Sequence, residues 1–186
     1  MKKLFAMTLA LCLLCVSAAA LAEKTAATEA TKVELDGFTL ELTRGELYQT
    51  NEKTVNGIYI MVYPLYASGD TAQNYSFIWA GSTFDQSVEG VQDELPGLEE
   101  SVRTELEAQG ISMDSFVTEE VYEATLNGTD CIALDYNINM SVSGQTLTVY
   151  GREILLGSMG YTITISALTS ESRDEITDQL AQSLNF

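Results

Sequence analysis

No histidine occurs anywhere in the 186-residue sequence. This absence excludes catalytic triads and dyads that use histidine as the general base, and it excludes zinc sites and proton relays built on imidazole. The sequence also lacks a Walker-type glycine loop and a dinucleotide-binding glycine fingerprint. We therefore expect no catalytic residues, no cofactor and no metal site.

Cysteine is nearly as scarce. Two of the three cysteines lie within the first 15 residues, and Cys131 is the only other one. A lone cysteine forms neither an intrachain disulfide nor a structural zinc site by itself. Cys131 lies in an alternating apolar run typical of a β-strand, and its neighbour Asp130 would raise the thiol pKa. We expect Cys131 to be a buried, structural residue.

The first 22 residues have the pattern of a secretory signal peptide. Lys2 and Lys3 precede an apolar run over residues 4–16, and a small-residue cleavage site ends at Ala22. This run is shorter than the about 20 residues that span a bilayer. Leucine precedes both early cysteines, which disfavours lipid attachment. We expect cleavage after Ala22, no stable membrane insertion afterwards, and a secreted, extracellular or periplasmic protein; an uncleaved anchor is the alternative.

Basic residues are few. After residue 22 the sequence has 27 acidic and 7 basic residues, a formal net charge of −20. Residues 85–123 contain twelve acids and one base, Arg103. The electric field of this negative charge repels nucleic acid and anionic membranes. It indicates either solubility in an extracellular medium or attraction to a cationic partner or weakly bound calcium.

The pattern of polar and apolar residues predicts a single folded domain. Residues 23–32, EKTAATEATK, are small and polar without an apolar period, which indicates a flexible tether. Apolar patterning then continues from Val33 to Phe186 without an internal repeat or second linker. We predict one domain over residues 33–186, large enough to bury a core without disulfides.

The first half of this domain predicts strands followed by one long helix. A hairpin is expected around Asp36-Gly37. The segments NGIYIMVYPLYA and YSFIWAG are apolar on both faces, as in central strands of a covered sheet. Apolar residues then repeat at helical spacing from Val88 to Leu106.

Three residues mark the expected start, end and bend of that helix. Asp85 is the expected N-cap and Gly110 the expected stop. Pro96 lies inside the pattern, and because proline has no N–H to donate, the helix should bend or restart there. The apolar stripe keeps its phase across Pro96, so both parts should pack on the same sheet face.

The second half predicts an antiparallel meander and a terminal helix. Regular strands are separated by Gly-bearing turns, the first of them at Asn127-Gly128. Ser172 and Glu175 form a capping box, and Ile176, Leu180 and Leu184 form a buried stripe. The order of elements predicts an α+β fold with helices packed on an antiparallel sheet.

Five features carry a resemblance to a known family: GFTLEL, the acidic helix ending in EAQGI, NGTDCIALDYN, GYTITISA and the terminal SLNF. They resemble the PsbP-like superfamily, which includes photosystem II accessory proteins, a Ran-binding nuclear import factor and DcrB-like bacterial envelope proteins. The resemblance covers most of residues 33–186 and implies an α/β/α sandwich with mainly non-catalytic binding or assembly roles.

The most suggestive candidate surface is the polar side of the meander. Alternation places Asp135, Asn137 and Asn139 on one face of a strand. Tyr150 and Arg152 share a face of the next strand with Thr146 and Thr148, although Gly151 could form a bulge that shifts the phase. A strand over residues 130–142 would be about 43 Å long and could project as a ribbon. Such a surface could bind sugar or peptide, or it could simply be a solvated sheet face.

Together these observations predict a secreted, non-enzymatic binding or accessory protein of the bacterial envelope or exterior. Its partner would be an unknown protein or glycan. One alternative is a carboxylate-dependent hydrolase, which would need two acids in a cleft and a carboxyl with a raised pKa. Another is a purely structural partner of an envelope protein.

Overall fold

In the computed structural model, the described residues are 25–26, 31–35, 38–42, 47–48, 51–55, 58–66, 74–79, 83, 86–142 and 144–186. The predicted signal peptide lies outside them, and so does most of the predicted tether. Within residues 23–32 the structure describes a two-residue strand and the start of another. No helix of the described part combines the length and apolar character that a membrane span requires.

Two antiparallel sheets and two helices make up the described part of the chain, which confirms the predicted α+β class. The larger sheet has the order β1-β4-β6-β7-β11-β10-β9-β8, with β5 pairing with β6; the smaller has the order β12-β3-β2. The bounds are β1 Thr25–Ala26, β2 Thr31–Leu35, β3 Phe38–Leu42, β4 Leu47–Tyr48, β5 Asn51–Val55, β6 Ile58–Tyr66, β7 Asn74–Trp79, α2 Val88–Ala108, β8 Ser112–Leu126, β9 Thr129–Val142, β10 Gln145–Leu156, β11 Tyr161–Ala167, α3 Ser170–Ser183 and β12 Leu184–Asn185.

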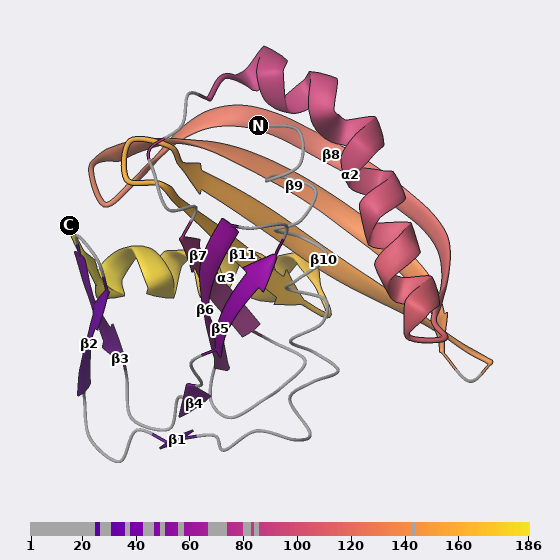
Figure 1. Cartoon of the computed structure of the whole chain (residues 1–186), viewed down its shortest axis with the longest axis horizontal. Helices are drawn as coiled ribbons and strands as arrows, with labels where there is room; N and C mark the ends of the chain where they lie inside the picture. The colour runs from indigo at the N-terminus through magenta and orange to yellow at the C-terminus, as the bar shows by residue number, and fades with distance from the viewer. Residues whose placement is uncertain are drawn as a thin grey trace.

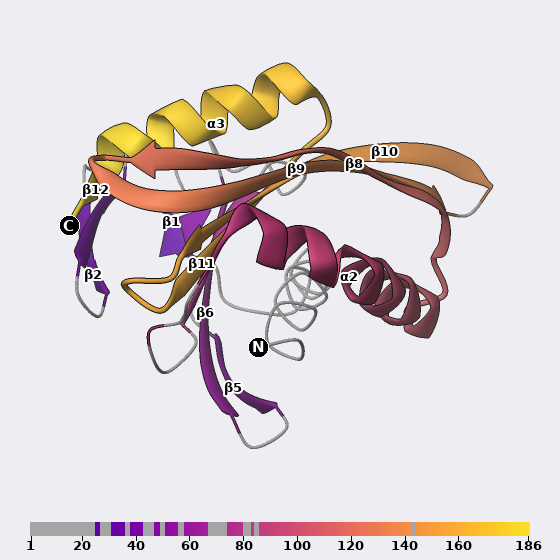
Figure 2. The same cartoon turned by 90° about the horizontal axis from the view of Figure 1, so that it is seen from above.

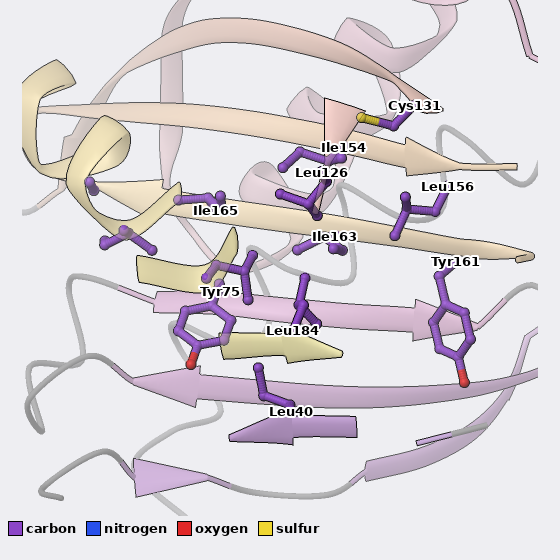
Figure 3. Packing of buried hydrophobic residues seen from close by; sticks show 13 residues of the cluster. Leu40, Tyr75, Leu126, Cys131, Ile154, Leu156, Tyr161, Ile163, Ile165 and Leu184 are labelled. Carbon is purple, nitrogen blue, oxygen red and sulfur yellow. The ribbon is translucent and has the colours of Figure 1, made fainter. Parts of the chain in front are cut away.

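The two helices cover opposite faces of the meander β8–β11, as the predicted sandwich requires (Figure 2). One core cluster joins Ile176 and Leu180 of α3 to the sheet, and Figure 3 shows it from close by. A second cluster joins the apolar stripe of α2 to alternate residues of β9, including Leu134 and Ile138. Because neighbouring strand residues point to opposite faces, β8, β9 and β10 each supply residues to both clusters, whereas β11 supplies only the first.

Helix α2 begins two residues later than predicted. Its N-cap is Ser87, whose hydroxyl accepts a hydrogen bond from the Gly90 N–H at 3.1 Å. The prediction of Asp85 as the cap was therefore wrong, because a serine nearer to the first apolar residue offers an equally good short acceptor. The predicted stop at Gly110 is confirmed: Gly110 has a φ of +78°, and its N–H donates to the Glu107 carbonyl.

Pro96 does not interrupt α2, so the alternative of a restart was wrong. A proline removes one backbone hydrogen bond, whereas the stripe on both sides of it is held by the core. Val91 and Val102, on either side of Pro96, lie in the same cluster with the sheet, which confirms the shared face. Figure 1 shows the helix axis changing direction gradually along its length.

The meander follows the predicted turns, and its last helix starts earlier than predicted. Asn127 and Gly128 have φ values of 47° and 82°, as a two-residue hairpin turn requires. The N-cap of α3 is Thr169, which accepts from the Ser172 N–H, so the assignment of Ser172 as the cap was wrong. Several hydroxyl residues in a row leave the sequence ambiguous at this position.

Gly151 does not form the suspected bulge. It pairs directly with Tyr136 in an uninterrupted β9–β10 register, and a Cβ on Gly151 would lie 2.1 Å from the tyrosine ring. Glycine is therefore needed to let the buried Tyr136 ring cross the strand. Register shifts occur instead in β8, at Asp114 and Glu119.

Cys131 is buried in the α3-side core with 4% of its surface exposed, as predicted. Burial, with a smaller contribution from Asp130, raises the pKa of its thiol to about 11. We expect Cys131 to react with a thiol reagent only on unfolding. Replacing it with serine should reduce the free energy of unfolding by about 1 to 3 kcal/mol, since a hydroxyl would be buried there. Rapid labelling of the native protein would contradict this placement.

Candidate functional site

The strand register brings all five predicted site residues onto the α3 side of the sheet. Across β9 and β10, Asp135 pairs with Arg152 and Asn137 pairs with Tyr150, and Asn139 follows two residues further along β9. The five nevertheless fall into two groups with different surroundings. Asp135 and Arg152 lie beside α3, whereas Asn137, Asn139 and Tyr150 lie on the part of β9–β10 toward the turn between these strands.

Asp135 and Arg152 form a two-pronged ion pair. The Arg152 Nε and Nη2 atoms each lie 2.6 Å from an oxygen of the Asp135 carboxylate. Only 12% and 10% of the two side chains is exposed. Arg152 also donates to Thr177 and Asp174 of α3, both at 3.0 Å. This arginine therefore ties the terminal helix to the centre of the sheet.

A second arginine completes the network. Arg173 of α3 is 5% exposed and contacts Glu119 at 2.8 Å, Asp174 at 3.2 Å and Asp135 at 3.3 Å. We call these residues the arginine–carboxylate cluster, whose members are Asp135, Arg152, Arg173, Glu119 and Asp174. Sequence reasoning did not find Arg173 or Glu119. The available signal was that Arg173 continues the buried stripe of Ile176 and Leu180, where an arginine needs carboxylate partners.

Ion pairing favours the charged forms of Glu119 and Arg152. The hydrogen bond from Arg173 lowers the pKa of Glu119. Burial alone would favour the neutral form of Arg152, but the hydrogen bond and charge of Asp135 outweigh it and raise the pKa of Arg152. Because every charged group has a partner of opposite sign, the cluster stabilises the α3–sheet contact and leaves no free guanidinium to bind a ligand.

The remaining predicted residues belong to a polar ladder across three strands. Thr148 donates to Asn139 at 2.6 Å, Asn139 donates to Ser115 at 2.8 Å, and Asn137 donates to Glu119 at 3.2 Å. Val117 has 45% of its surface exposed beside them. We call this surface the amide–hydroxyl ladder, and it consists of Ser115, Val117, Asn137, Asn139, Thr148 and Tyr150.

The ladder lies where the sheet extends past α3. In both Figures 1 and 2 the β9–β10 hairpin tip projects beyond the rest of the described chain, in agreement with the predicted ribbon. Its opposite face carries Leu134, Ile138 and Met140 against α2. The ladder is therefore a sheet face that is packed from behind by α2 and that no helix of the described residues covers.

Glu153 is a second feature that sequence reasoning missed. It lies on the α2 side of β10, is 1% exposed, and accepts hydrogen bonds from Thr164 at 2.8 and 2.9 Å. Burial raises the pKa of Glu153 to about 8. Among the residues that the structure describes, Glu153 has the Thr164 hydroxyl as its partner and no positively charged side chain in contact. With no such charge to offset the cost of burial, the carboxyl binds a proton at neutral pH.

An open hollow of about 550 Å³ lies at the far end of the β8–β9 hairpin. We call it the hairpin hollow. It contains two carboxylates, Glu123 and Asp130, but Glu153 is not part of its lining. No group of three metal-ligating side chains was found among the residues that the structure describes. The lining residues are Gln86, Glu123, Ala124, Thr125, Asp130, Cys131 and Ile132.

Comparison with known proteins identifies the fold. No protein-family model and no curated protein matches the sequence. The solution structure of cyanobacterial PsbP (CyanoP) from Synechocystis matches with a TM-score of 0.52 at 15% identity, over 85% of this chain and 92% of that chain. A Pseudomonas aeruginosa protein, PA94, matches with a TM-score of 0.37 at 15% identity, over 83% and 92% of the two chains. The likeness to CyanoP confirms the predicted PsbP-like fold.

Proposed function

We propose that this chain is a secreted, non-enzymatic binding or accessory protein whose partner docks on the amide–hydroxyl ladder. The observation that carries the proposal is the α3-side face of the projecting strands, which neither α2 nor α3 covers. On the same strands the opposite face is packed by α2, and the neighbouring stretch is anchored by the arginine–carboxylate cluster. A partly exposed face whose side chains are already ordered by hydrogen bonds can bind a partner at small conformational cost.

The composition of the ladder favours a protein partner over a glycan. The side chains of Ser115, Asn139 and Thr148 already hydrogen-bond one another. They present an ordered, mildly polar surface with Val117 and Tyr150 as contact residues, of which tyrosine is enriched at protein interfaces. The predicted signal peptide, the strong negative charge and the fold likeness to cyanobacterial PsbP support an accessory role outside the cytoplasm.

Site-directed photo-crosslinking in the living host tests this proposal. Benzoylphenylalanine placed at Thr148 should give one discrete crosslinked product, because it lies within the docking face. The same probe at Gln179, exposed on α3, should not give that product. Mass spectrometry then identifies the partner, and a product consisting of glycan would redirect the proposal to a sugar ligand. Equal products from both positions, or none from Thr148, would contradict ladder docking.

A carboxylate-dependent hydrolase is the second candidate, favoured by the two acids of the hairpin hollow. Glu123 and Asp130 could act as an acid and base pair only if both contact a substrate there. The carboxyl with a raised pKa, Glu153, is not part of this hollow. Hydrolysis of polysaccharide or peptide substrates that disappears in both Glu123→Gln and Asp130→Asn would establish the enzyme and displace the binding role.

A further inference from the structure

Strand β8 is an open edge of the larger sheet. Within the described part of the chain it pairs only with β9. Bulges at Asp114 and Glu119 interrupt its first half, which leaves residues 120–126 as its longest regular stretch. The outward N–H and C=O groups of such a stretch can pair with an added strand.

The hairpin hollow lies beside this regular stretch. Thr125 pairs with Asp130, and Glu123 pairs with Ile132. Ile132 belongs to the α2-side core, so alternation places the side chains of Glu123, Thr125 and Asp130 on that same side. An extended segment added to the edge would present every second side chain toward these two carboxylates.

The cations of residues 86–186 do not neutralise this region. Residues 86–186 contain 18 acids and three arginines, and each arginine already lies in an ion pair away from the hollow. Strand β8 itself contains four acids and no base. The exposed carboxylates of Glu123 and Asp130 have no arginine of residues 86–186 paired with them and suit a positively charged partner group.

The negative charge of β8 and the hairpin hollow determines which kind of partner can pair with this edge. A second copy of this chain pairing edge to edge through β8 would place acidic residues near acidic residues, which is unfavourable. An extended polypeptide with lysine or arginine at alternate positions would satisfy both the backbone edge and the carboxylates. We propose that residues 120–126 of β8 accept such a cationic strand from a partner protein, with a basic side chain held in the hairpin hollow. The carboxylates of this site lie on the α2 side of the sheet, whereas the amide–hydroxyl ladder lies on the α3 side.

Fluorescence anisotropy with defined peptides tests the proposal on the intact domain. The probe is a labelled nine-residue peptide of alternating lysine and threonine. A second peptide of equal charge carries N-methyl groups on two adjacent central residues, which blocks both of its backbone edges. We expect the methylated peptide to bind at least about fivefold more weakly, because charge alone does not replace strand pairing.

Paired variants separate the hollow from the general acidity of the protein. Glu123→Gln with Asp130→Asn should weaken binding of the lysine–threonine peptide at least about fivefold. The control, Glu100→Gln with Glu107→Gln, removes the same charge from exposed positions on α2 and should change binding less than about twofold. Equal binding of the two peptides, equal loss in both variants, or no binding at millimolar peptide would each overturn the proposal. None of these measurements involves the amide–hydroxyl ladder, so they test the β8 site separately from ladder docking.

Discussion

Replacing Glu153 with glutamine is expected to remove most of the pH dependence of stability between pH 5 and pH 8. The pKa of Glu153 is raised to about 8 in the folded protein by burial, against an ordinary value of 4.5. The folded state therefore holds a proton that the unfolded state releases above pH 4.5. Stability is highest at low pH in this window and falls as the pH rises toward 8.

The size of this effect follows from the linkage relation. Between pH 5 and pH 8 the free energy of unfolding of the wild type should fall by about 3 kcal/mol. Glu153→Gln keeps a neutral group of similar shape and should show little slope over the same range. Histidine is absent, so no other side chain with an ordinary pKa titrates in the middle of the window.

Urea unfolding at pH 5, 6, 7 and 8 measures both proteins. The matched control is Glu107→Gln, which removes an exposed carboxylate from α2 and should retain the wild-type slope. A wild type whose stability does not change with pH, or a Glu153→Gln variant with an unchanged slope, would show that Glu153 is not held neutral.

Replacing Arg152 with methionine is expected to destabilise the fold by about 3 kcal/mol at pH 7. Methionine has a similar length but leaves Asp135, 7% exposed, with the longer 3.3 Å contact to Arg173 as its one remaining ion pair among the described residues. Removing one partner of a buried ion pair is costly because the other charge stays buried. Asp174 adds less to this cost, since 55% of its side chain is exposed.

Chemical denaturation of two further variants checks whether the loss of stability comes from the Asp135 carboxylate that is left without its partner. Arg103→Met removes an arginine from the more exposed ion pair with Glu99 and should cost no more than about 1 kcal/mol. Combining Arg152→Met with Asp135→Asn should cost less than the sum of the single changes, because the stranded carboxylate is gone. A strictly additive double variant would contradict a direct role for the pair.

Local patterns predicted most of this fold. The helical stripe from Val88 to Leu106, the Asn127-Gly128 turn and the alternation along β9 each depend on neighbouring residues, and each is confirmed by the structure. The helix caps were less certain because several short polar residues compete at each start. At Pro96 the stabilisation from packing one apolar face on the sheet outweighs the cost of losing one backbone hydrogen bond.

The candidate site was only partly predictable because its decisive contacts are distant in sequence. Alternation placed Asp135 and Arg152 on one face, but the contact of Arg173 with Glu119 spans 54 residues and depends on how α3 lies on the sheet. Glu153 follows Arg152 in a strand and resembles an ordinary exposed acid in the sequence. Its burial depends on the sheet that forms around it, in which Thr164 of β11 lies opposite Glu153.

The dissociation constant of the crosslinked partner, measured by titration calorimetry, tests ladder docking most directly. The comparison is between the wild type and the double variant Val117→Ser with Tyr150→Ala. We expect the variant to bind at least about tenfold more weakly, since contact residues at an interface centre dominate affinity. Its unfolding midpoint should stay within about 4 °C of the wild type. An unchanged dissociation constant in a folded variant would contradict the proposal that the ladder is the docking surface.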